Sequence, residues 1–282
     1  MNNFNESIND ILHEPIGIES SESIIDAIKI ILDNQISRVI TFDSKKPVGI
    51  VSEKDILSFL FHDKLHRSIG KVSLKEIMNE ILFVESNTSM SKAAQIMIGK
   101  RCSSVAVGSS SKLEGLVTKT DLTKYYAEKL AGKQKVIDWM SLHYFSVLTN
   151  DVLYEVLKTM LGFGISRMMI LDLDKQPIGI ISTGDIFRAV LKIETIAQMK
   201  KSLDKSNDSE EFWSKYGVFC SQPAGKIMTK NIIKVKANQD LADACKVMIE
   251  KKINAVGVES SDGRLAGIVG KRDVLLALAS MK

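Results

Sequence analysis

The sequence lacks several features that would assign it to a particular class of protein. Its formal net charge is only +4, without the basic stripe that favours a nucleic-acid partner. Its 3 cysteines are scattered, so we expect reduced thiols and a cytoplasmic location. The first residues do not resemble a signal peptide, and no apolar run approaches about 18 residues, so we expect no membrane span.

Motifs that would indicate catalysis or metal binding are also missing. There is no Ser–His–Asp phrase, no P-loop and no Gly-x-Gly-x-x-Gly, so nothing argues for an enzyme. His62 and His66 stand four residues apart and would share one face of a helix, as some zinc ligands do. Asp63 stands where zinc proteases use Glu, and no third histidine follows at a recognisable spacing. We therefore expect exposed histidines at a helix end and no metal site.

The chain does contain one phrase that occurs four times. Each copy has a glycine, two aliphatic residues, three further residues and an aspartate that opens an apolar helix. The copies cover residues 49–55, 115–121, 179–185 and 267–273. A period of roughly sixty residues, sustained four times, indicates an array of one structural unit.

A second landmark lies upstream of each phrase, in what we call the opening segment of the repeat. A methionine or leucine stands 43 to 45 residues before each aspartate, at Leu12, Met78, Met140 and Met228. Between the two landmarks the hydrophobic pattern predicts strand, helix, strand, strand, helix. We expect the last two strands to pair antiparallel and the strand–helix–strand step to allow parallel pairing.

One such unit is too small to bury its helices and its sheet, so the repeats should pair. We expect repeats one and two to form one pair, and repeats three and four the other. The repeats cover residues 1–66, 67–131, 132–192 and 224–282, with an insertion or linker at 193–223. The prediction is an α+β fold of four tandem repeats in two modules, packed as a disc because the tether 131–135 is short.

The insertion is charged in its middle, which favours a helix end or disorder. Phe212, Trp213, Tyr216 and Phe219 then follow at helical spacing. We expect these aromatic side chains to pack on the module, and docking of another protein is the alternative.

The recurring phrase has two interpretations. A hydroxyl followed three residues later by an acid is a capping box, which needs no ligand. However, the acid is aspartate in all four copies, and Asp273 is kept although Gly270 replaces the hydroxyl. A carboxylate at a strand-to-helix junction can also accept both hydroxyls of a ribose, while the helix N-terminus favours a phosphate. That combination is used in nucleotide recognition.

The repeat, its final phrase and its opening segment resemble the CBS domain, named for cystathionine β-synthase. Four copies in one chain are similar to the gamma subunits of AMP-activated protein kinase, whose two CBS pairs close into a disc. The resemblance implies clefts between paired repeats that bind adenosyl ligands. In such clefts the aspartate holds the ribose, the Ser or Thr lies near ribose or phosphate, and the adenine lies between apolar strands.

Carried over to this sequence, the resemblance implies a specific set of residues. Ribose binding falls on Asp55, Asp121, Asp185 and Asp273, and the hydroxyl role on Ser52, Thr118 and Ser182. Phosphate contacts fall on Arg38 and Arg167. The alternative interpretation of each arginine is a solvated cation at the end of a strand. Repeats two and four have Ser104 and Ala255 at that position, and Gly270 puts the fourth site in doubt.

The expected function is that of a regulatory module for energy sensing, not of an enzyme. Its ligand would be AMP, ADP, ATP or S-adenosylmethionine, with no cofactor required, and occupancy would be transmitted to an unidentified regulated protein. A homodimer is left open, and no nucleic acid or membrane partner is expected. The alternative is an interaction scaffold whose clefts are unoccupied.

Overall fold

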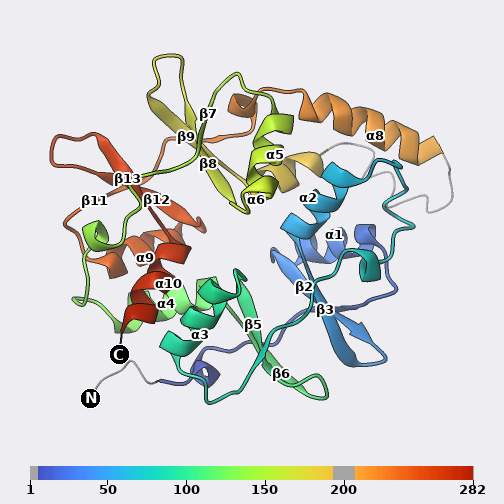
Figure 1. Cartoon of the computed structure of the whole chain (residues 1–282), viewed down its shortest axis with the longest axis horizontal. Helices are drawn as coiled ribbons and strands as arrows, with labels where there is room; N and C mark the ends of the chain where they lie inside the picture. Colours follow the sequence, from blue (N-terminus) through green and yellow to red (C-terminus); the bar gives the residue numbers. More distant parts are fainter. Residues whose placement is uncertain (1–5, 193–206, 282) are drawn as a thin grey trace. The chain divides into compact units, whose positions relative to one another are not determined.

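The computed structural model describes residues 6–192 and 207–281. Within them each repeat has the predicted order of strand, helix, strand, strand, helix (Figure 1). Repeat one contains β1 (Gly17–Glu19), α1 (Ile24–Asp33), β2 (Arg38–Asp43), β3 (Lys46–Ser52) and α2 (Glu53–His62). Repeat two contains β4 (Phe83–Val84), α3 (Met90–Gly99), β5 (Ser104–Gly108), β6 (Leu113–Thr118) and α4 (Lys119–Lys129).

The second half of the chain repeats this order with one added helix and one added strand. Repeat three contains β7 (Ser146–Leu148), α5 (Leu153–Gly162), β8 (Arg167–Leu171), β9 (Pro177–Ser182) and α6 (Thr183–Val190). Repeat four contains β10 (Thr229–Lys230), β11 (Lys234–Lys236), α9 (Leu241–Glu250), β12 (Ala255–Glu259), β13 (Leu265–Gly270) and α10 (Lys271–Ser280). The insertion contributes α8 (Asn207–Cys220).

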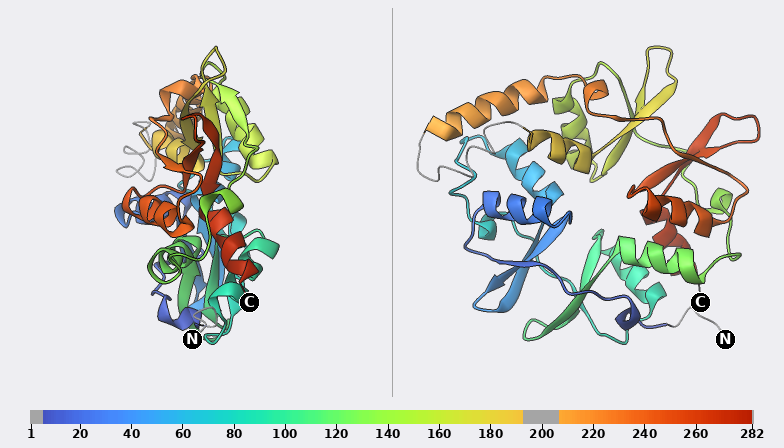
Figure 2. Two further views of the ribbon diagram at one scale, coloured as in Figure 1. Left: turned by 90° about the vertical axis from the view of Figure 1, so that its left-hand side faces the viewer. Right: turned by 180° about the vertical axis from the view of Figure 1, so that it is seen from behind.

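Every repeat builds the same small mixed sheet. With β10 set aside, the first strand of each repeat is parallel to its second, and the second and third strands form an antiparallel hairpin, as predicted. In repeat three the sheet has a fourth strand, because β10 pairs antiparallel with β9. The hairpins β2–β3 and β8–β9 project as long arrows in the right-hand view of Figure 2. The α+β fold of four repeats is therefore confirmed.

The repeats are grouped into two compact units. Unit 1 comprises the described residues of Met1–Pro15, Ile81–Tyr144 and Ile232–Lys282, and unit 2 those of Ile16–Glu80 and Phe145–Asn231. Unit 1 thus holds the sheets and helices of repeats two and four, and unit 2 those of repeats one and three. The expected pairing of repeats one with two and three with four is wrong for the hydrophobic cores. Amphipathic helices show that a face is buried, not which repeat covers it.

Each unit has one core, formed by helices of its two repeats. In unit 1, α3 and α4 contact α10, and α4 also contacts α9. Tyr126, on α4, is fully buried there. In unit 2, α2 contacts α5 and α6, and α8 contacts α5. Two repeats are needed for each core because a single repeat has too little apolar surface to exclude water.

The aromatic residues of the insertion pack on unit 2, as predicted. Phe212, Trp213, Tyr216 and Phe219 are all buried on α8 and belong to the core of this unit. The indole N–H of Trp213 donates to the backbone oxygen of Arg67 at 3.0 Å. Residues 193–206, with much of the charged middle of the insertion, lie outside the described residues.

The opening segments do not pack on the repeats that they open. Each is a 3₁₀ turn followed by one residue that bridges to the recurring phrase of the neighbouring repeat. The bridges join His13 to Leu116, Asn79 to Ile50, Ser141 to Ile268 and Thr229 to Ile180. Repeats one and two therefore exchange opening segments, and so do repeats three and four.

This exchange explains the glycine that begins each phrase. A Cβ atom on Gly49 would lie 2.6 Å from the Met78 sulfur, and one on Gly179 would lie 2.7 Å from the Met228 sulfur. A Cβ on Gly267 would lie 2.5 Å from the backbone oxygen of Ser141, closer than real Cβ atoms approach. The glycine of the recurring phrase and the opening segment of the neighbouring repeat are therefore in contact. Glycine is required because the opening segment crosses the strand too closely for a side chain.

Candidate functional site

The four recurring phrases lie where the last strand of each repeat passes into its last helix. Ser52, Thr118, Ser182 and Gly270 are the N-cap residues of α2, α4, α6 and α10, and each has an extended backbone. The aspartate is the third residue of the helix in every case. The sequence therefore places a carboxylate at a helix N-terminus at all four junctions, with a hydroxyl at three of them. The first amide of each helix donates to a backbone oxygen of the same repeat.

The geometry of a capping box is present in three junctions. The Oδ2 atom of Asp55 accepts from the backbone N–H of Ser52 at 2.8 Å and from its hydroxyl at 2.6 Å. The corresponding distances are 2.7 and 2.7 Å for Asp121 with Thr118. They are 2.9 and 2.6 Å for Asp185 with Ser182. The acid half of the predicted capping box is thus present at all three junctions, and it uses one carboxylate oxygen of each aspartate. The hydroxyl half is seen at two of them, where the aspartate N–H donates to Thr118 at 3.4 Å and to Ser182 at 3.2 Å.

The fourth junction keeps only the backbone half of this arrangement. The N–H of Gly270 donates to Asp273 Oδ2 at 2.7 Å, and glycine offers no hydroxyl. The hydroxyl of Ser141, in the opening segment of repeat three, donates to Asp273 Oδ1 at 3.4 Å. Asp273 therefore also has a hydroxyl partner, which comes from elsewhere in the chain.

The remaining partners of the aspartates differ from repeat to repeat. Arg188 Nη2 contacts Asp185 Oδ1 at 3.0 Å, and His13 Nδ1 lies 3.5 Å from Asp121 Oδ2. For Asp55, the cap of α2 accounts for the hydrogen bonds seen in the described part of the chain. The carboxylates of Asp121 and Asp185 are 24% and 19% exposed, so both remain accessible from solvent.

Arg38 and Arg167 stand beside the N-caps of their own repeats. In the antiparallel hairpins, Arg38 is the register partner of Ser52, and Arg167 is the register partner of Ser182. The guanidinium of Arg38 donates to the hydroxyl of Ser37, at 3.0 Å from Nη2. Both arginines belong to unit 2. The two candidate phosphate contacts are thus in the same unit, next to the junctions of repeats one and three.

Within unit 2 these two junctions face each other. A Cβ atom on Gly184, at the start of α6, would lie 3.4 Å from the carboxylate of Glu53, the first residue of α2. Burial raises the pKa of Glu53, an effect that the charges of Arg188 and Arg38 oppose and that of Asp185 reinforces. Glu53 and Arg188 could not be identified from the sequence, because only the fold brings repeats one and three together.

Unit 1 has the corresponding arrangement with a different charge. Lys271, the first residue of α10, is buried, and its ammonium donates to the hydroxyl of Thr120 on α4 at 3.0 Å. The register partners of Thr118 and Gly270 are the uncharged Ser104 and Ala255. Cations therefore lie beside the junctions of both units. In unit 2 they are arginines on two strands and on α6, and in unit 1 the cation is a lysine at the start of α10.

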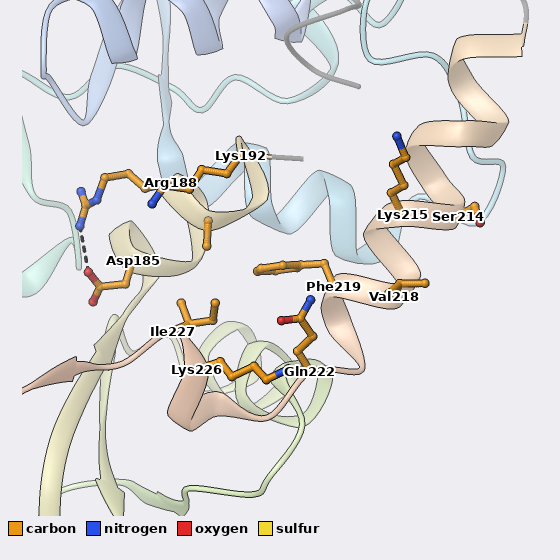
Figure 3. A pocket seen from close by; sticks show the side chains of 11 residues that line it. Asp185, Arg188, Lys192, Ser214, Lys215, Val218, Phe219, Gln222, Lys226 and Ile227 are labelled. Carbon is orange, nitrogen blue, oxygen red and sulfur yellow. Dashed lines mark hydrogen bonds and ion pairs between the residues drawn. The ribbon is translucent and has the colours of Figure 1, made fainter. Parts of the chain in front are cut away.

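A hollow of about 640 Å³ adjoins the junction of repeat three. Its walls come from α6, α8 and the segment that leads into repeat four, as the side chains in Figure 3 show. Asp185 and Arg188 form an ion pair at one side, and Lys192, Lys215 and Lys226 also line the hollow. The charged residues of its lining are therefore mostly cations, and Phe219 is among its apolar members.

The two histidines considered as metal ligands do not share a helix face. α2 ends at His62, and His66 lies beyond it with a φ of 51°. The ring of His66 stacks on Trp213 at 4.9 Å, while Nδ1 of His62 contacts the backbone oxygen of Ser58 at 2.8 Å. Across residues 6–192 and 207–281 no group of acidic, histidine or cysteine side chains is arranged to hold a metal ion.

Comparison with known proteins identifies the repeat. The family model of the CBS domain matches residues 8–62, 74–128, 136–192 and 224–280. The chain belongs to the CBS domain family. These matches cover most of the chain as CBS domains, and no catalytic domain is identified. Among the described helices none is long and apolar enough to cross a membrane.

Archaeal CBS proteins are among the relatives that resemble the whole chain. The crystal structure of MJ1225 from Methanocaldococcus jannaschii, a candidate archaeal homologue of gamma-AMPK, superimposes with a TM-score of 0.81. The match covers 97% of this chain and 100% of that one, at 20% identity. MJ1404 from the same organism is 26% identical over 85% of this chain. The chain spans only 53% of the length of MJ1404.

A smaller CBS protein has been solved with a nucleotide. CBSX2, whose crystal structure is in complex with AMP, matches 51% of this chain at 20% identity with a TM-score of 0.38. The architecture of four CBS domains is therefore shown by the match to MJ1225, and ligands are known from CBS relatives.

Proposed function

We propose that the protein is a regulatory module that binds adenine nucleotides or S-adenosylmethionine at its strand-to-helix junctions. The observation that supports this proposal is which carboxylate oxygens of the aspartates already accept hydrogen bonds and which do not. The helix cap occupies Oδ2 of Asp55, Asp121 and Asp185. In Asp55 and Asp121 the other oxygen, Oδ1, has no hydrogen-bond partner among the described residues, and a ribose hydroxyl can donate to it.

The neighbouring groups suit the rest of a nucleotide. The first amides of α2 and α6, those of Glu53 and Thr183, donate to the backbone oxygens of Ser37 and Ser166. The second amides, those of Lys54 and Gly184, lack partners within their helices, and a phosphate group can accept from them. Arg38 and Arg167 flank these two helix starts through the strand register, and guanidinium groups bind phosphate oxygens in pairs. The hydroxyl of Ser52 keeps acceptor capacity after donating to Asp55 and can receive a ligand hydroxyl, whereas those of Thr118 and Ser182 also accept from helix amides.

The same geometry gives a route from binding to regulation. Because α2 and α6 face each other in unit 2, a phosphate at either helix start lies in the field of Glu53 and Arg188. A bound anion would favour Arg188 and repel Glu53, and so alter the packing of two repeats at once. In our proposal this change in packing is what a regulated partner protein recognises.

A calorimetric titration of the purified protein with AMP, ADP, ATP and S-adenosylmethionine tests the proposal. The sharper experiment repeats the titration with the 2′,3′-dideoxy form of the tightest-binding nucleotide. Loss of the charge-assisted bonds, each worth about 1.5–3 kcal/mol, should weaken binding at least tenfold. Absence of binding by every adenosyl ligand would contradict the proposal. Equal affinity for the dideoxy analogue would contradict ribose recognition by the aspartates.

An interaction scaffold with unoccupied clefts is the second candidate. It is favoured by the capping geometry, since the hydroxyl–acid pairs of three repeats already satisfy one another. A scaffold needs these residues only for helix stability. It therefore predicts no heat of binding with any of the four ligands.

A further inference from the structure

Basic side chains line the hollow beside repeat three from three segments of the chain (Figure 3). Arg188 belongs to α6, and Lys192 follows two residues after that helix ends. Lys215 belongs to α8, and Lys226 to the turn that leads into repeat four. Among the described residues of the lining, only Asp185 is acidic. The lining therefore carries an excess of positive charge, which favours an anionic ligand.

Two of these cations, Lys192 and Lys226, have no ion-pair partner within residues 6–192 and 207–281. The other two are paired: Lys215 Nζ contacts Glu211 at 2.7 Å, and Arg188 Nη2 contacts Asp185 at 3.0 Å. Lys192 and Lys226 are both exposed. Their charges are therefore available to neutralise a ligand that enters the hollow.

The other three repeats lack this arrangement of cations. Arg188 and Lys192 stand three and seven residues after Asp185. The residues at the same positions are Ser58 and His62 in repeat one, Lys124 and Glu128 in repeat two, and Leu276 and Ser280 in repeat four. A ligand that needs cations beyond the aspartate is therefore expected at the junction of repeat three alone.

Arg188 controls access to the carboxylate of Asp185. The cap of α6 uses Oδ2, and Arg188 Nη2 contacts Oδ1. A ribose hydroxyl that binds Oδ1 must therefore displace the guanidinium. The side chain of Arg188 is 57% exposed, and ion pairs at such exposure are weak, so a ligand that offers Arg188 another anion can replace it. A phosphate group does so, because a guanidinium binds two phosphate oxygens at once.

We propose that the junction of repeat three is specific for a nucleoside polyphosphate such as ADP or ATP, with its outer phosphates in the hollow beside Lys192 and Lys226. The proposal rests on the proposed function and selects among the ligands which that function allows. The ribose replaces Arg188 on Asp185, the first phosphate binds Arg188, and the next phosphates neutralise the two lysines. AMP has no phosphate left for the lysines. S-adenosylmethionine has a positively charged sulfonium in place of the first phosphate, so this junction excludes it.

Calorimetric titrations with ATP and AMP, without divalent cations, test the proposal on the double variant Lys192→Gln/Lys226→Gln. In the wild type one site per chain should bind ATP at least about tenfold more tightly than AMP. Because both lysines are exposed, the substitutions leave the core intact. Each should weaken ATP binding at this site about twofold to fivefold, the range for an exposed ion pair, and the double variant should weaken it about tenfold. The affinity for AMP should stay within about twofold.

The exchange at Asp185 is tested separately with Arg188→Ala. This variant leaves Oδ1 open and removes the partner of the first phosphate. Adenosine, which has no phosphate, should therefore bind the variant more tightly than the wild type, while ATP should bind it more weakly. Equal affinities of the two proteins for adenosine would overturn the exchange.

The matched control is Lys124→Gln/Lys158→Gln, which removes two exposed lysines that contact Glu128 and Glu155. It should change neither affinity. If nucleotides bind but the lysine double variant behaves like this control, or loses AMP as strongly as ATP, the polyphosphate proposal is wrong and the proposed function stands. Binding of S-adenosylmethionine that Asp185→Asn weakens would also overturn it. If no adenosyl ligand binds the wild type, the proposed function fails and this proposal fails with it.

Discussion

Replacing Asp55 by asparagine separates helix capping from ligand binding at one junction. The amide oxygen can take the place of Oδ2 and still accept from the N–H and hydroxyl of Ser52. Only the charge is lost, so two charge-assisted bonds become neutral ones. From the difference between those classes we expect Asp55→Asn to lower the free energy of unfolding by about 1 kcal/mol. That corresponds to about 2–4 °C in melting temperature for a chain of this size.

The effect on a ribose ligand should be larger. An amide NH₂ at the position of Oδ1 donates and cannot accept, so a ligand hydroxyl loses its partner there. A loss of at least about 1.4 kcal/mol weakens binding tenfold. At a ligand concentration one hundred times the wild-type Kd, the stabilisation from this junction should fall from about 2.7 to about 1.4 kcal/mol. Melting curves with and without AMP or ATP measure this difference directly.

The chain provides a matched control in a second capping box of the same unit. Ser23 caps α1, and its N–H and hydroxyl both donate to Asp26, but no recurring phrase lies there. Asp26→Asn should therefore cost about as much stability as Asp55→Asn and leave the ligand-induced shift intact. If both variants keep the full shift, Asp55 serves only the helix. If both lose it equally, the loss reflects general destabilisation, and a separate role of Asp55 in ligand binding is refuted.

Three further predictions concern the fold. Gly267→Ala should lower the free energy of unfolding by about 1–3 kcal/mol, because its Cβ would meet a backbone oxygen at 2.5 Å. Gly99→Ala, which meets nothing within 4 Å at the end of α3, should be neutral or stabilising in the same denaturant titration. Trp213→Phe should cost about 1 kcal/mol by removing the donor to the Arg67 oxygen, and an unchanged midpoint would contradict this. Burial raises the pKa of Glu53 above its ordinary 4.5, so the folded protein holds that proton more tightly than the unfolded chain does. Ionisation then costs stability as pH rises through the folded pKa, and Glu53→Gln should be more stable than the wild type at pH 7 but not below about pH 4.5.

Much of each repeat could be predicted from the sequence because the signals are local. The period of apolar residues gives the order of strands and helices, and Ser-x-x-Asp gives a helix cap that the structure contains. Buried Phe212 and Tyr216 follow from helical spacing in the same way. These predictions depend only on residues within a few positions of one another.

The partner of each repeat could not be predicted, because an apolar helix face does not specify what covers it. α2 packs on α6 of repeat three, and α4 packs on α10 of repeat four. These helices are far apart in the sequence, and the hydrophobic periodicity carries no information over such distances. The site residues missed for this reason are Glu53, Arg188 and Lys271. The spacing of Met78 and Gly49 did carry a signal, since a bulky residue matched to a glycine indicates a close contact.

The exchange of opening segments has a consequence for dividing this protein into pieces. A cut in the tether 131–135 preserves both exchanges, because repeats one and two stay on one fragment and repeats three and four on the other. The same cut divides both cores, since each unit draws its helices from both fragments. Neither fragment contains a complete hydrophobic core. Together the two fragments contain all residues of both cores and lack only the peptide bond that was cut. We therefore expect that neither fragment folds alone and that the two fragments reassemble when mixed.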